Sequence, residues 1–213
     1  MQLDLYTFDW SGVISNDIKP VYKSNMRLFD HFGIPRISLE EWKGRSTLSP
    51  VGILSDHGVT AEKKEIDELY EKHLNDVIRE GVVPKVYLDA KEVLEFLKNR
   101  NKILSVVSSH PENNLLGEAK EYGLKIYFDL ILAGSGEEKA ERLRKTFTRF
   151  GKKPENVIYT GDTFKDIQEA KKAGVHSACV CNGYHERERL EKENPEFVLE
   201  NLSELKNIEL ITS

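Results

Sequence analysis

The 213-residue sequence has few of the features that mark secreted or membrane proteins. No apolar run approaches the roughly 18 residues that a transmembrane helix needs. The mean hydropathy is −0.49. The amino-terminal segment carries an acid at Asp4 and no basic stretch ahead of an apolar one, so we expect no signal peptide. We therefore expect a cytoplasmic protein that does not contact the membrane.

Cysteine is nearly absent from the chain. Cys179 and Cys181 are the two cysteines, and both stand in one short apolar run. They would share one face of a strand, but no second pair of Cys or His stands at a spacing suited to a metal. We therefore expect two small buried side chains in a reducing compartment.

An excess of positive charge is also missing. The 31 Lys and Arg residues are outnumbered by 36 Asp and Glu, and the net charge of −5 argues against a protein that coats nucleic acid or an anionic membrane. The stretch from Arg142 to Lys153 is strongly basic, but Leu143, Phe147 and Phe150 recur within it at helical spacing. We expect its charges to form the solvated outer face of a helix, and we predict no nucleic-acid partner.

Short apolar runs alternate with amphipathic stretches along most of the chain. The expected strands are a run from Leu3 to Phe8, then 102–107, 129–133, 157–160, 178–180 and 197–199. The expected helices are 89–100, 111–122, 137–150 and 164–173, the last ended by Gly174. Such alternation over about 130 residues is typical of an α/β fold, in which helices cover both faces of a parallel sheet.

Residues 15–84 break this alternation. Their apolar spacing predicts helices at 18–32, 38–43 and 60–80, the last capped by Thr60, and no strand. We interpret the segment as an inserted all-α domain, joined to the rest by linkers near 14–18 and 81–86. The predicted organisation is a discontinuous α/β domain of residues 1–14 and 85–213 with a helical domain of residues 15–84.

Polar side chains follow four of the expected strands. In chain order they are Asp9, Trp10 and Ser11; then Ser108, Ser109 and His110; then Lys139 after a glycine-rich turn; and finally Asp162 and Asp166. Because ligands bind at the carboxyl ends of the strands in an open parallel sheet, we expect these residues to meet. A cluster of carboxylates suits Mg²⁺, and a lysine beside it suits the phosphate that such an ion accompanies. Either Asp162 or Asp166, taken alone, could instead be a helix N-cap.

These four stretches resemble the motifs of the haloacid dehalogenase superfamily, in the branch with a helical cap that includes phosphoglycolate phosphatases and β-phosphoglucomutases. YTFDWSGVISN is similar to the first motif and ILSVVSS to the second. Lys139 stands where the third motif has its lysine, and VIYTGDTFKDIQEAKKAG is similar to the fourth. The resemblance covers the whole chain. It implies a Rossmann-like core with an inserted cap, and a hydrolase that acts on a small phosphorylated metabolite as a monomer or homodimer.

The resemblance also implies a role for each matched residue. Asp9 would be the nucleophile that forms an aspartyl-phosphate. Mg²⁺ would be held by Asp9, the main-chain carbonyl of Ser11 and Asp162, with Asp166 bound directly or through water. The phosphoryl oxygens would be held by Ser108 and Lys139, assisted by main-chain amides around Trp10, Ser11 and Ser109.

Ser11 departs from the family pattern. Phosphatases of the superfamily place an Asp there, which protonates the leaving group and then deprotonates the attacking water. A serine hydroxyl is a poor general acid or base, and such a proton transfer is typically worth about 10²–10⁴ in rate. We expect a phosphatase that is slow, or one that uses another proton carrier such as His110, His57 or a further residue of the cap.

Two other interpretations stay open. Phosphonoacetaldehyde hydrolases also lack this Asp, have Asp-Trp-Ala-Gly-Thr at the first motif, and cleave carbon–phosphorus bonds through a cap lysine, for which Lys43 is the candidate. A non-catalytic protein that binds phosphate and Mg²⁺ is the second. The phosphatase is preferred because Lys139 is present where phosphonoacetaldehyde hydrolases usually have arginine. L-2-haloacid dehalogenases lack the double-acid metal motif that this chain retains.

Substrate recognition is expected in the cap. Lys43 and Arg45 fall where capped relatives place recognition residues, and the guanidinium of Arg45 can bind a carboxylate or phosphate through two hydrogen bonds. An exposed loop that is basic by chance is the alternative. Trp10 would line the leaving-group pocket or pack beneath the cap. Ser109 and His110 complete the expected substrate-binding residues.

Overall fold

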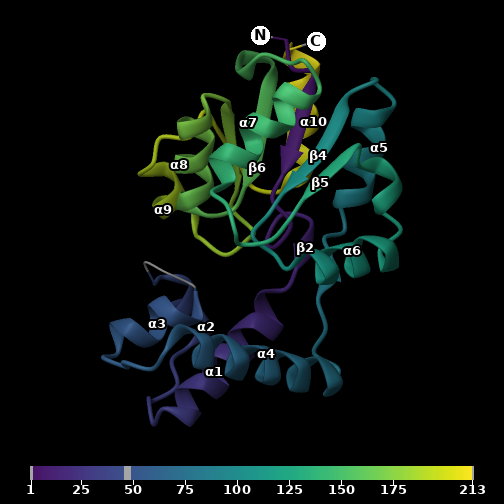
Figure 1. The fold of residues 1–213 in the computed structure, drawn as a ribbon. Helices are drawn as coiled ribbons and strands as arrows, with labels where there is room; N and C mark the ends of the chain where they lie inside the picture. Colours follow the sequence, from purple (N-terminus) through teal and green to yellow (C-terminus); the bar gives the residue numbers. More distant parts are fainter. Residues whose placement is uncertain (1, 46–48, 213) are drawn as a thin grey trace. The chain divides into compact units, whose positions relative to one another are not determined.

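The computed structural model describes residues 2–45 and 49–212, which form two compact units (Figure 1). One unit contains the chain up to Asn16 and from Val86 onward, and the other runs from Asp17 to Lys85. The domain boundaries expected from the sequence, after residues 14 and 84, fall slightly earlier in the chain. None of the helices in the described ranges is long and apolar enough to cross a membrane.

The larger unit is built on a six-stranded parallel sheet. Its strands are β1 (Leu5–Phe8), β4 (Ile103–Val107), β5 (Leu130–Leu132), β6 (Val157–Gly161), β7 (His176–Val180) and β8 (Phe197–Leu199). They lie in the order β5-β4-β1-β6-β7-β8, and each adjacent pair is parallel. Leu5 of β1 is opposite Ile103 on one side and Val157 on the other. The predicted α/β fold with a parallel sheet is confirmed.

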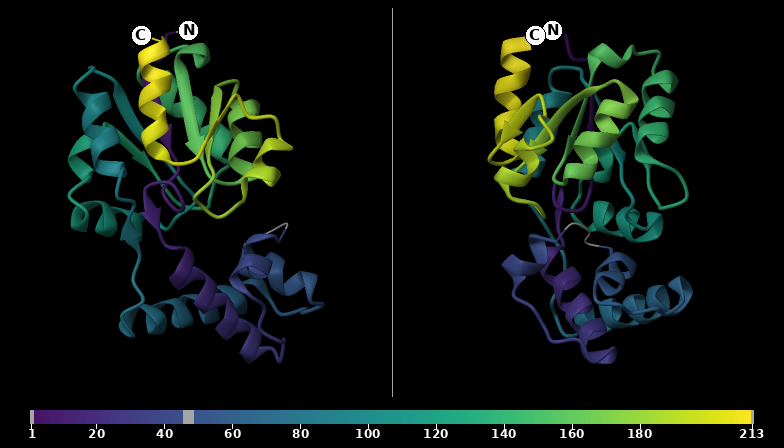
Figure 2. Two further views of the ribbon diagram at one scale, coloured as in Figure 1. Left: turned by 180° about the vertical axis from the view of Figure 1, so that it is seen from behind. Right: turned by 90° about the vertical axis from the view of Figure 1, so that its left-hand side faces the viewer.

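Helices cover both faces of this sheet (Figure 2). They are α5 (Ala90–Lys98), α6 (Glu112–Glu121), α7 (Lys139–Arg149), α8 (Phe164–Ala173), α9 (Arg187–Glu191) and α10 (Leu205–Thr212). Because side chains of a strand alternate between its faces, Tyr6 and Phe8 join the apolar core formed with α5, α6 and α10. Leu5 joins the opposite core, which α7 and α8 complete. The residues that follow the strands are thereby held at one edge of a rigid layer.

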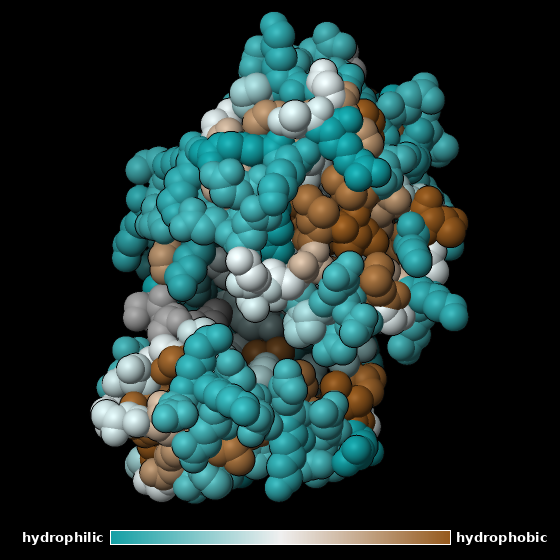
Figure 3. Space-filling model, viewed as in Figure 1, coloured by the Kyte–Doolittle hydropathy of each residue, from teal (hydrophilic) through white to brown (hydrophobic). Residues whose placement is uncertain are grey.

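The strand β5 forms one edge of the sheet, and its three residues are all half-buried. Figure 3 shows apolar side chains gathered over this part of the larger unit, beside a surface that is mostly hydrophilic. An edge strand pairs with one neighbour only, so its outer side is left without a strand partner in this sheet.

The helix α8 begins and ends where the sequence pattern predicts. The hydroxyl of Thr163 accepts a hydrogen bond from the N–H of Asp166, and the carboxylate of Asp166 accepts one from the N–H of Thr163, which is a capping box. Gly174 ends the helix in the left-handed region, with φ of +78°. Thr163 is therefore the N-cap, Asp166 takes part in the capping box from inside the first turn, and Asp162 precedes the cap.

The second unit contains four helices in the described ranges. They are α1 (Ile18–His31), α2 (Leu39–Lys43), α3 (Pro50–Asp56) and α4 (Lys63–Arg79). Its buried apolar side chains include Met26 and Phe29 of α1, Ile53 of α3, and Ile66 and Val77 of α4. The 3.6-residue period of these positions explains why α1 and α4 are predicted from the sequence.

Three local expectations for this segment are wrong. The helix α3 is not predicted, although Ser49 is its N-cap and Pro50 its first residue. The helix α4 begins after Glu62, so that Thr60 is not its cap. The two-residue strands β2 (Ser15–Asn16) and β3 (Lys85–Val86) pair with each other where linkers without strands are expected. A pairing this short leaves no alternation to detect in the sequence.

Candidate active site

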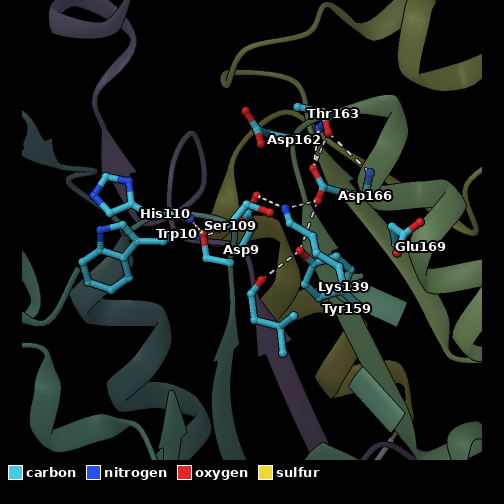
Figure 4. A network of polar contacts seen from close by, with 12 residues as sticks. Asp9, Trp10, Ser109, His110, Lys139, Tyr159, Asp162, Thr163, Asp166 and Glu169 are labelled. Atoms are coloured by element: carbon cyan, nitrogen blue, oxygen red, sulfur yellow. Dashed lines mark hydrogen bonds and ion pairs between the residues drawn. The ribbon is translucent and has the colours of Figure 1, made fainter. Parts of the chain in front are cut away.

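Asp9 directly follows β1 and is almost fully buried. Each oxygen of its carboxylate accepts a hydrogen bond from a separate donor. The main-chain N–H of Trp10 lies 2.8 Å from Oδ1, and Nζ of Lys139 lies 2.7 Å from Oδ2. Lys139 is the first residue of α7, and its Nζ is also 2.6 Å from Oδ1 of Asp166 (Figure 4). The structure thus joins residues of three separate motifs.

Three carboxylates converge at this point. One oxygen each from Asp9, Asp162 and Asp166 lie within 4.8 Å of one another, and all three residues are buried. Asp162 follows β6, and Asp166 is in the first turn of α8. Lys139 forms ion pairs with Asp9 and Asp166 but not, among those in the described residues, with Asp162. One ammonium group therefore faces three acids.

The surroundings of the three acids shift their pKa values in different directions. Burial raises the pKa of Asp162 well above its ordinary value, and the charges of Asp166 and Asp9 add to this effect. Burial also raises the pKa of Asp9, which Lys139 offsets only in part. Burial acts on Asp166 too, but Lys139 and Thr163 outweigh it and lower its pKa. The uncompensated negative charge is concentrated on Asp162 and Asp9.

Asp162 shows that this site suits a divalent cation. Its Oδ2 accepts a hydrogen bond from the N–H of Tyr184 at 2.7 Å, but its Oδ1 is buried without a hydrogen-bond partner in the described residues. A buried carboxylate oxygen without a donor is costly unless a cation binds it. All the nearby side-chain ligands are oxygen atoms, which Mg²⁺ prefers. The residues present therefore fit the ion that the sequence motifs imply.

Two glycines allow the chain to pass close to Asp162. A Cβ at Gly12, which has φ of +75°, would lie 1.9 Å from Oδ2 of Asp162. A Cβ at Gly183 would lie 2.4 Å from Cβ of the same aspartate. Both distances are far below van der Waals contact, so a side chain at either position would displace this acid. Gly12 belongs to the first motif, whereas Gly183 lies outside the four motifs and its role is seen only in the structure.

The loops after β4 and β5 are joined by Arg142, a residue that the sequence analysis placed on a solvated helix face. Arg142 is only 5% exposed. Its Nη1 donates hydrogen bonds to the carbonyl oxygens of Ser108 and Gly134, and its Nη2 is 3.5 Å from Oγ of Ser109. Arg142 follows Lys139 by about one helical turn, so both face the same edge of the sheet. That spacing is the signal that could have identified it.

Ser11 lies beside His110, with its Oγ 3.1 Å from Nδ1 of the imidazole. The Nε2 atom of His110 lies 3.5 Å from Oε1 of Glu118 on α6. The main-chain N–H of His110 donates to Oγ of Ser108 at 3.2 Å, which ties the second motif to the same cluster. Sequence reasoning singled out Ser11, Ser108 and His110 but missed Glu118. A charged residue on the apolar face of α6, between Leu115 and Tyr122, is the signal that could have found it.

Trp10 is fully buried and packs in the apolar core of the larger unit. Its ring stacks on Tyr122, with ring centroids 6.1 Å apart. Its Nε1 donates to Oε2 of Glu118 at 2.8 Å, and that same oxygen accepts a hydrogen bond from Oγ of Ser15 at 2.7 Å. The structure therefore gives the Trp10 side chain a contact that the sequence does not predict, in which it holds Glu118.

Lys43 and Arg45 belong to the second unit. Lys43 is the last residue of α2, and Arg45 follows it closely. Nη2 of Arg45 lies 3.1 Å from Oε1 of Glu41, one helical turn earlier. The guanidinium of Arg45 is thus paired with a carboxylate of its own unit.

The two cysteines are free thiols and are not members of the cluster of three acids. Cys179 is buried with Ile167 and Leu190, and burial raises the pKa of its thiol to about 12. Such a thiol stays protonated at neutral pH. Cys179 therefore behaves as the small buried side chain that the composition predicts.

The fold and this cluster define an α/β protein with an acidic centre at the carboxyl edge of a parallel sheet. A family model described as haloacid dehalogenase-like hydrolase matches residues 6–180. The chain therefore belongs to the haloacid dehalogenase-like hydrolases, and the resemblance stated from the motifs is confirmed.

Individual relatives agree with this assignment. The chain is 33% identical over 147 residues to a phosphoglycolate phosphatase of Aquifex aeolicus, which covers 67% of each protein. It is 22% identical over 205 residues to a phosphoglycolate phosphatase of Synechococcus elongatus, covering 93% of each. A solved haloacid dehalogenase-like family hydrolase of Streptococcus pneumoniae has the same fold, with a TM-score of 0.78, 18% identity, and coverage of 97% of this chain and 98% of that chain.

Proposed function

We propose that this hydrolase cleaves a small phosphomonoester, with Asp9 as the nucleophile that forms an aspartyl-phosphate. The observation that carries the proposal is the position of Asp9, whose carboxylate is buried at a strand end between Lys139 and two further acids. The relatives named phosphoglycolate phosphatase support a phosphorylated substrate, and a small acid of that kind is the first one to test.

The main obstacle for such a reaction is repulsion between an anionic nucleophile and an anionic phosphate. Lys139 offsets part of this charge, and its own charge is secure. Burial lowers the pKa of Lys139, but the charges of Asp166 and Asp9 outweigh it and raise this pKa above its ordinary value. Mg²⁺, held by Asp9, Asp162 and the main-chain carbonyl of Ser11, with Asp166 bound directly or through water, would supply the remaining positive charge.

The geometry of the nucleophile suits an attack on phosphorus. The main-chain N–H of Trp10 and the ammonium of Lys139 bind different oxygens of Asp9, which fixes the plane of the carboxylate. Ser108, buried after β4, would hold a phosphoryl oxygen together with Lys139 and the main-chain amide of Ser109. Arg142 would keep that loop in place through the carbonyl of Ser108.

The helical unit would supply substrate choice. In this proposal residues 17–85 form the cap, and Lys43 and Arg45 bind an anionic group on the metabolite. The guanidinium of Arg45 would leave Glu41 and bind that group through two hydrogen bonds. Replacing Arg45 with Lys would then raise KM most for substrates that carry a carboxylate beside the phosphate.

The test is release of inorganic phosphate from a panel of phosphomonoesters, including phosphoglycolate, in Mg²⁺ and in EDTA. We expect the wild type to hydrolyse a substrate in Mg²⁺ but not in EDTA, and we expect Asp9→Asn to lose this activity. The exposed Glu188→Gln variant of the same unit should keep full activity. Phosphoenzyme isolated from the wild type after an acid quench, and absent in Asp9→Asn, would identify the nucleophile.

Absence of hydrolysis across the panel would overturn the proposal, as would full activity of Asp9→Asn. Phosphonoacetaldehyde joins the panel because its cleavage would favour the alternative that uses Lys43.

A further inference from the structure

The strongest unexplained arrangement in the larger unit is a chain of three polar side chains beside Asp9. Oγ of Ser11 is 3.1 Å from Nδ1 of His110, and Nε2 of His110 is 3.5 Å from Oε1 of Glu118. We propose that Ser11, His110 and Glu118 form a proton relay that replaces the acid missing from position 11. This inference rests on the proposed function, since the relay serves an aspartyl-phosphate formed on Asp9.

Hydrogen bonds fix the orientation of the Glu118 carboxylate. Its Oε2 accepts hydrogen bonds from Nε1 of Trp10 at 2.8 Å and from Oγ of Ser15 at 2.7 Å, which leaves Oε1 directed at His110. A carboxylate fixed behind an imidazole sets the orientation of the ring and stabilises its charged form. The side chains of His110 and Glu118 are 14% and 15% exposed, so bulk water screens their pairing only weakly.

The relay is tied to the catalytic residues through neighbouring backbone atoms. Ser11 follows Asp9 by two residues, and the N–H of Trp10 between them binds the Asp9 carboxylate. The N–H of His110 binds Oγ of Ser108, the proposed phosphate ligand. Figure 4 shows His110 and Trp10 on one side of Asp9, with Lys139 and Asp166 on the other. In this proposal the His110 side of Asp9 transfers protons, and the Lys139 side neutralises negative charge.

The first half of the reaction consumes a proton. An oxygen of Asp9 bonds to phosphorus while the bond from phosphorus to the ester oxygen breaks. The departing oxygen takes the hydroxyl proton of Ser11, and Ser11 takes the proton on Nδ1 of His110. The imidazolium becomes neutral imidazole, and the alcohol leaves uncharged. Ser11 alone could not do this, since its hydroxyl is a weak acid until the imidazolium replaces its proton.

The second half returns that proton. A water molecule gives a proton to Ser11, whose own hydroxyl proton passes to Nδ1 of His110. The water oxygen bonds to phosphorus as the bond between phosphorus and Asp9 breaks, which releases inorganic phosphate and restores the carboxylate. One water is consumed for each ester cleaved, and His110 ends protonated, as it began.

The test separates the two halves by choice of leaving group. p-Nitrophenolate departs without a proton, whereas an alkyl alcohol such as glycerol needs one. In His110→Gln we expect p-nitrophenyl phosphate still to release a burst of p-nitrophenolate equal to the enzyme, with steady turnover reduced by about 10²–10⁴. Glycerol phosphate should lose both the burst and turnover. Ser11→Ala should behave in the same way, and Glu118→Gln should do so more weakly because it acts through His110.

Two further variants make this test specific. Nδ1 of His176 lies 2.5 Å from Oε2 of Glu196, so this pair also joins an imidazole to a carboxylate. His176 is the first residue of β7 and lies at the opposite end of that strand from the site. His176→Gln should therefore keep wild-type turnover. Adding Ser11→Asp to His110→Gln places an acid directly at the missing position, so we expect it to restore turnover of glycerol phosphate at least ten-fold.

The outcomes distinguish the relay from the proposed function. If wild-type enzyme forms no phosphoenzyme with any substrate, the proposed function fails, and the relay fails with it. If wild-type enzyme is active and His110→Gln hydrolyses both substrates within two-fold of the wild type, the relay alone is overturned. An equal loss of burst and turnover for both substrates in His110→Gln and Ser11→Ala would show a structural role and would also overturn the relay.

Discussion

Nζ of Lys139 lies 2.7 Å from Oδ2 of Asp9, and both side chains are largely withdrawn from solvent. A strand end and a helix start, 130 residues apart in the chain, are joined by this contact. It links the proposed nucleophile to the proposed phosphate ligand.

Removing the ammonium group should reduce catalysis strongly. We expect Lys139→Met to lower kcat by about 10²–10³, the range seen when one preorganised donor to a transition state is removed. Lys145→Met, on the exposed face of the same helix, is the matched control and should keep wild-type kcat. Steady-state kinetics with Mg²⁺ measures both, and a loss below ten-fold in Lys139→Met would contradict the assigned role.

Neutralising Asp162 should stabilise the metal-free protein. Burial and the charges of Asp166 and Asp9 raise the pKa of Asp162, so its ionised form destabilises the fold at pH 7. An acid whose pKa is raised in the folded state contributes stability at low pH and loses it as the pH rises through that pKa. In EDTA at pH 7 we expect Asp162→Asn to melt at a higher temperature than the wild type. The difference should be about 2–4 °C for each kcal/mol of destabilisation that the substitution removes.

Addition of Mg²⁺ should reverse the order of the melting temperatures of the wild type and Asp162→Asn. The wild type should gain melting temperature on addition of Mg²⁺, and Asp162→Asn should gain much less because one ligand has lost its charge. Scanning calorimetry of both proteins, with and without the ion, gives the four values needed. A lower melting temperature for Asp162→Asn in EDTA would argue against charge repulsion at this site.

A methyl group at position 183 should disturb the acidic cluster. The Cβ of Gly183→Ala would fall 2.4 Å from Cβ of Asp162, so the acid or the loop must move, at a cost of about 1–3 kcal/mol. Gly117→Ala, on α6, meets no atom within 4 Å and should be neutral or slightly stabilising. Chemical denaturation and phosphatase assays of the two variants provide the comparison. Equal stability and activity in both would mean that the loop adjusts freely.

Glu118 should make part of the stability depend on pH. Burial would raise its pKa, but the nearby His110 and the hydrogen bonds from Trp10 and Ser15 outweigh it, so the pKa of Glu118 lies below its ordinary value of 4.5. The stabilisation is present above that value and is lost as the pH falls through the lower, folded-state pKa. Glu118→Gln should therefore melt below the wild type at pH 7, and the gap should narrow below pH 4.5.

Glu121, exposed on the same helix, gives the control for this effect. Glu121→Gln should follow the wild-type melting temperature at each pH, because its side chain has no comparable set of donors in the described residues. A gap between Glu118→Gln and the wild type that stays constant from pH 7 to low pH would show that packing, not charge, is responsible.

Much of the fold was accessible from local patterns. The helix α8 was predicted from residue 164 to 173 because the glycine that ends it and the apolar spacing within it act over a few neighbouring residues. The helix α3 was missed because seven residues hold too few apolar positions to show a period. The convergence of Asp9, Lys139, Asp162 and Asp166 could be expected because parallel strands end at one edge.

The sequence by itself determined the alternation of strands and helices, the order of the four motifs, and the replacement of an acid by Ser11. These properties depend on residue type and spacing alone. Tertiary structure decided that Arg142 is buried between two loops, that Trp10 packs in the core, and that Glu118 stands behind His110. Such contacts join segments up to 108 residues apart, and their formation depends on how the helices pack on the sheet.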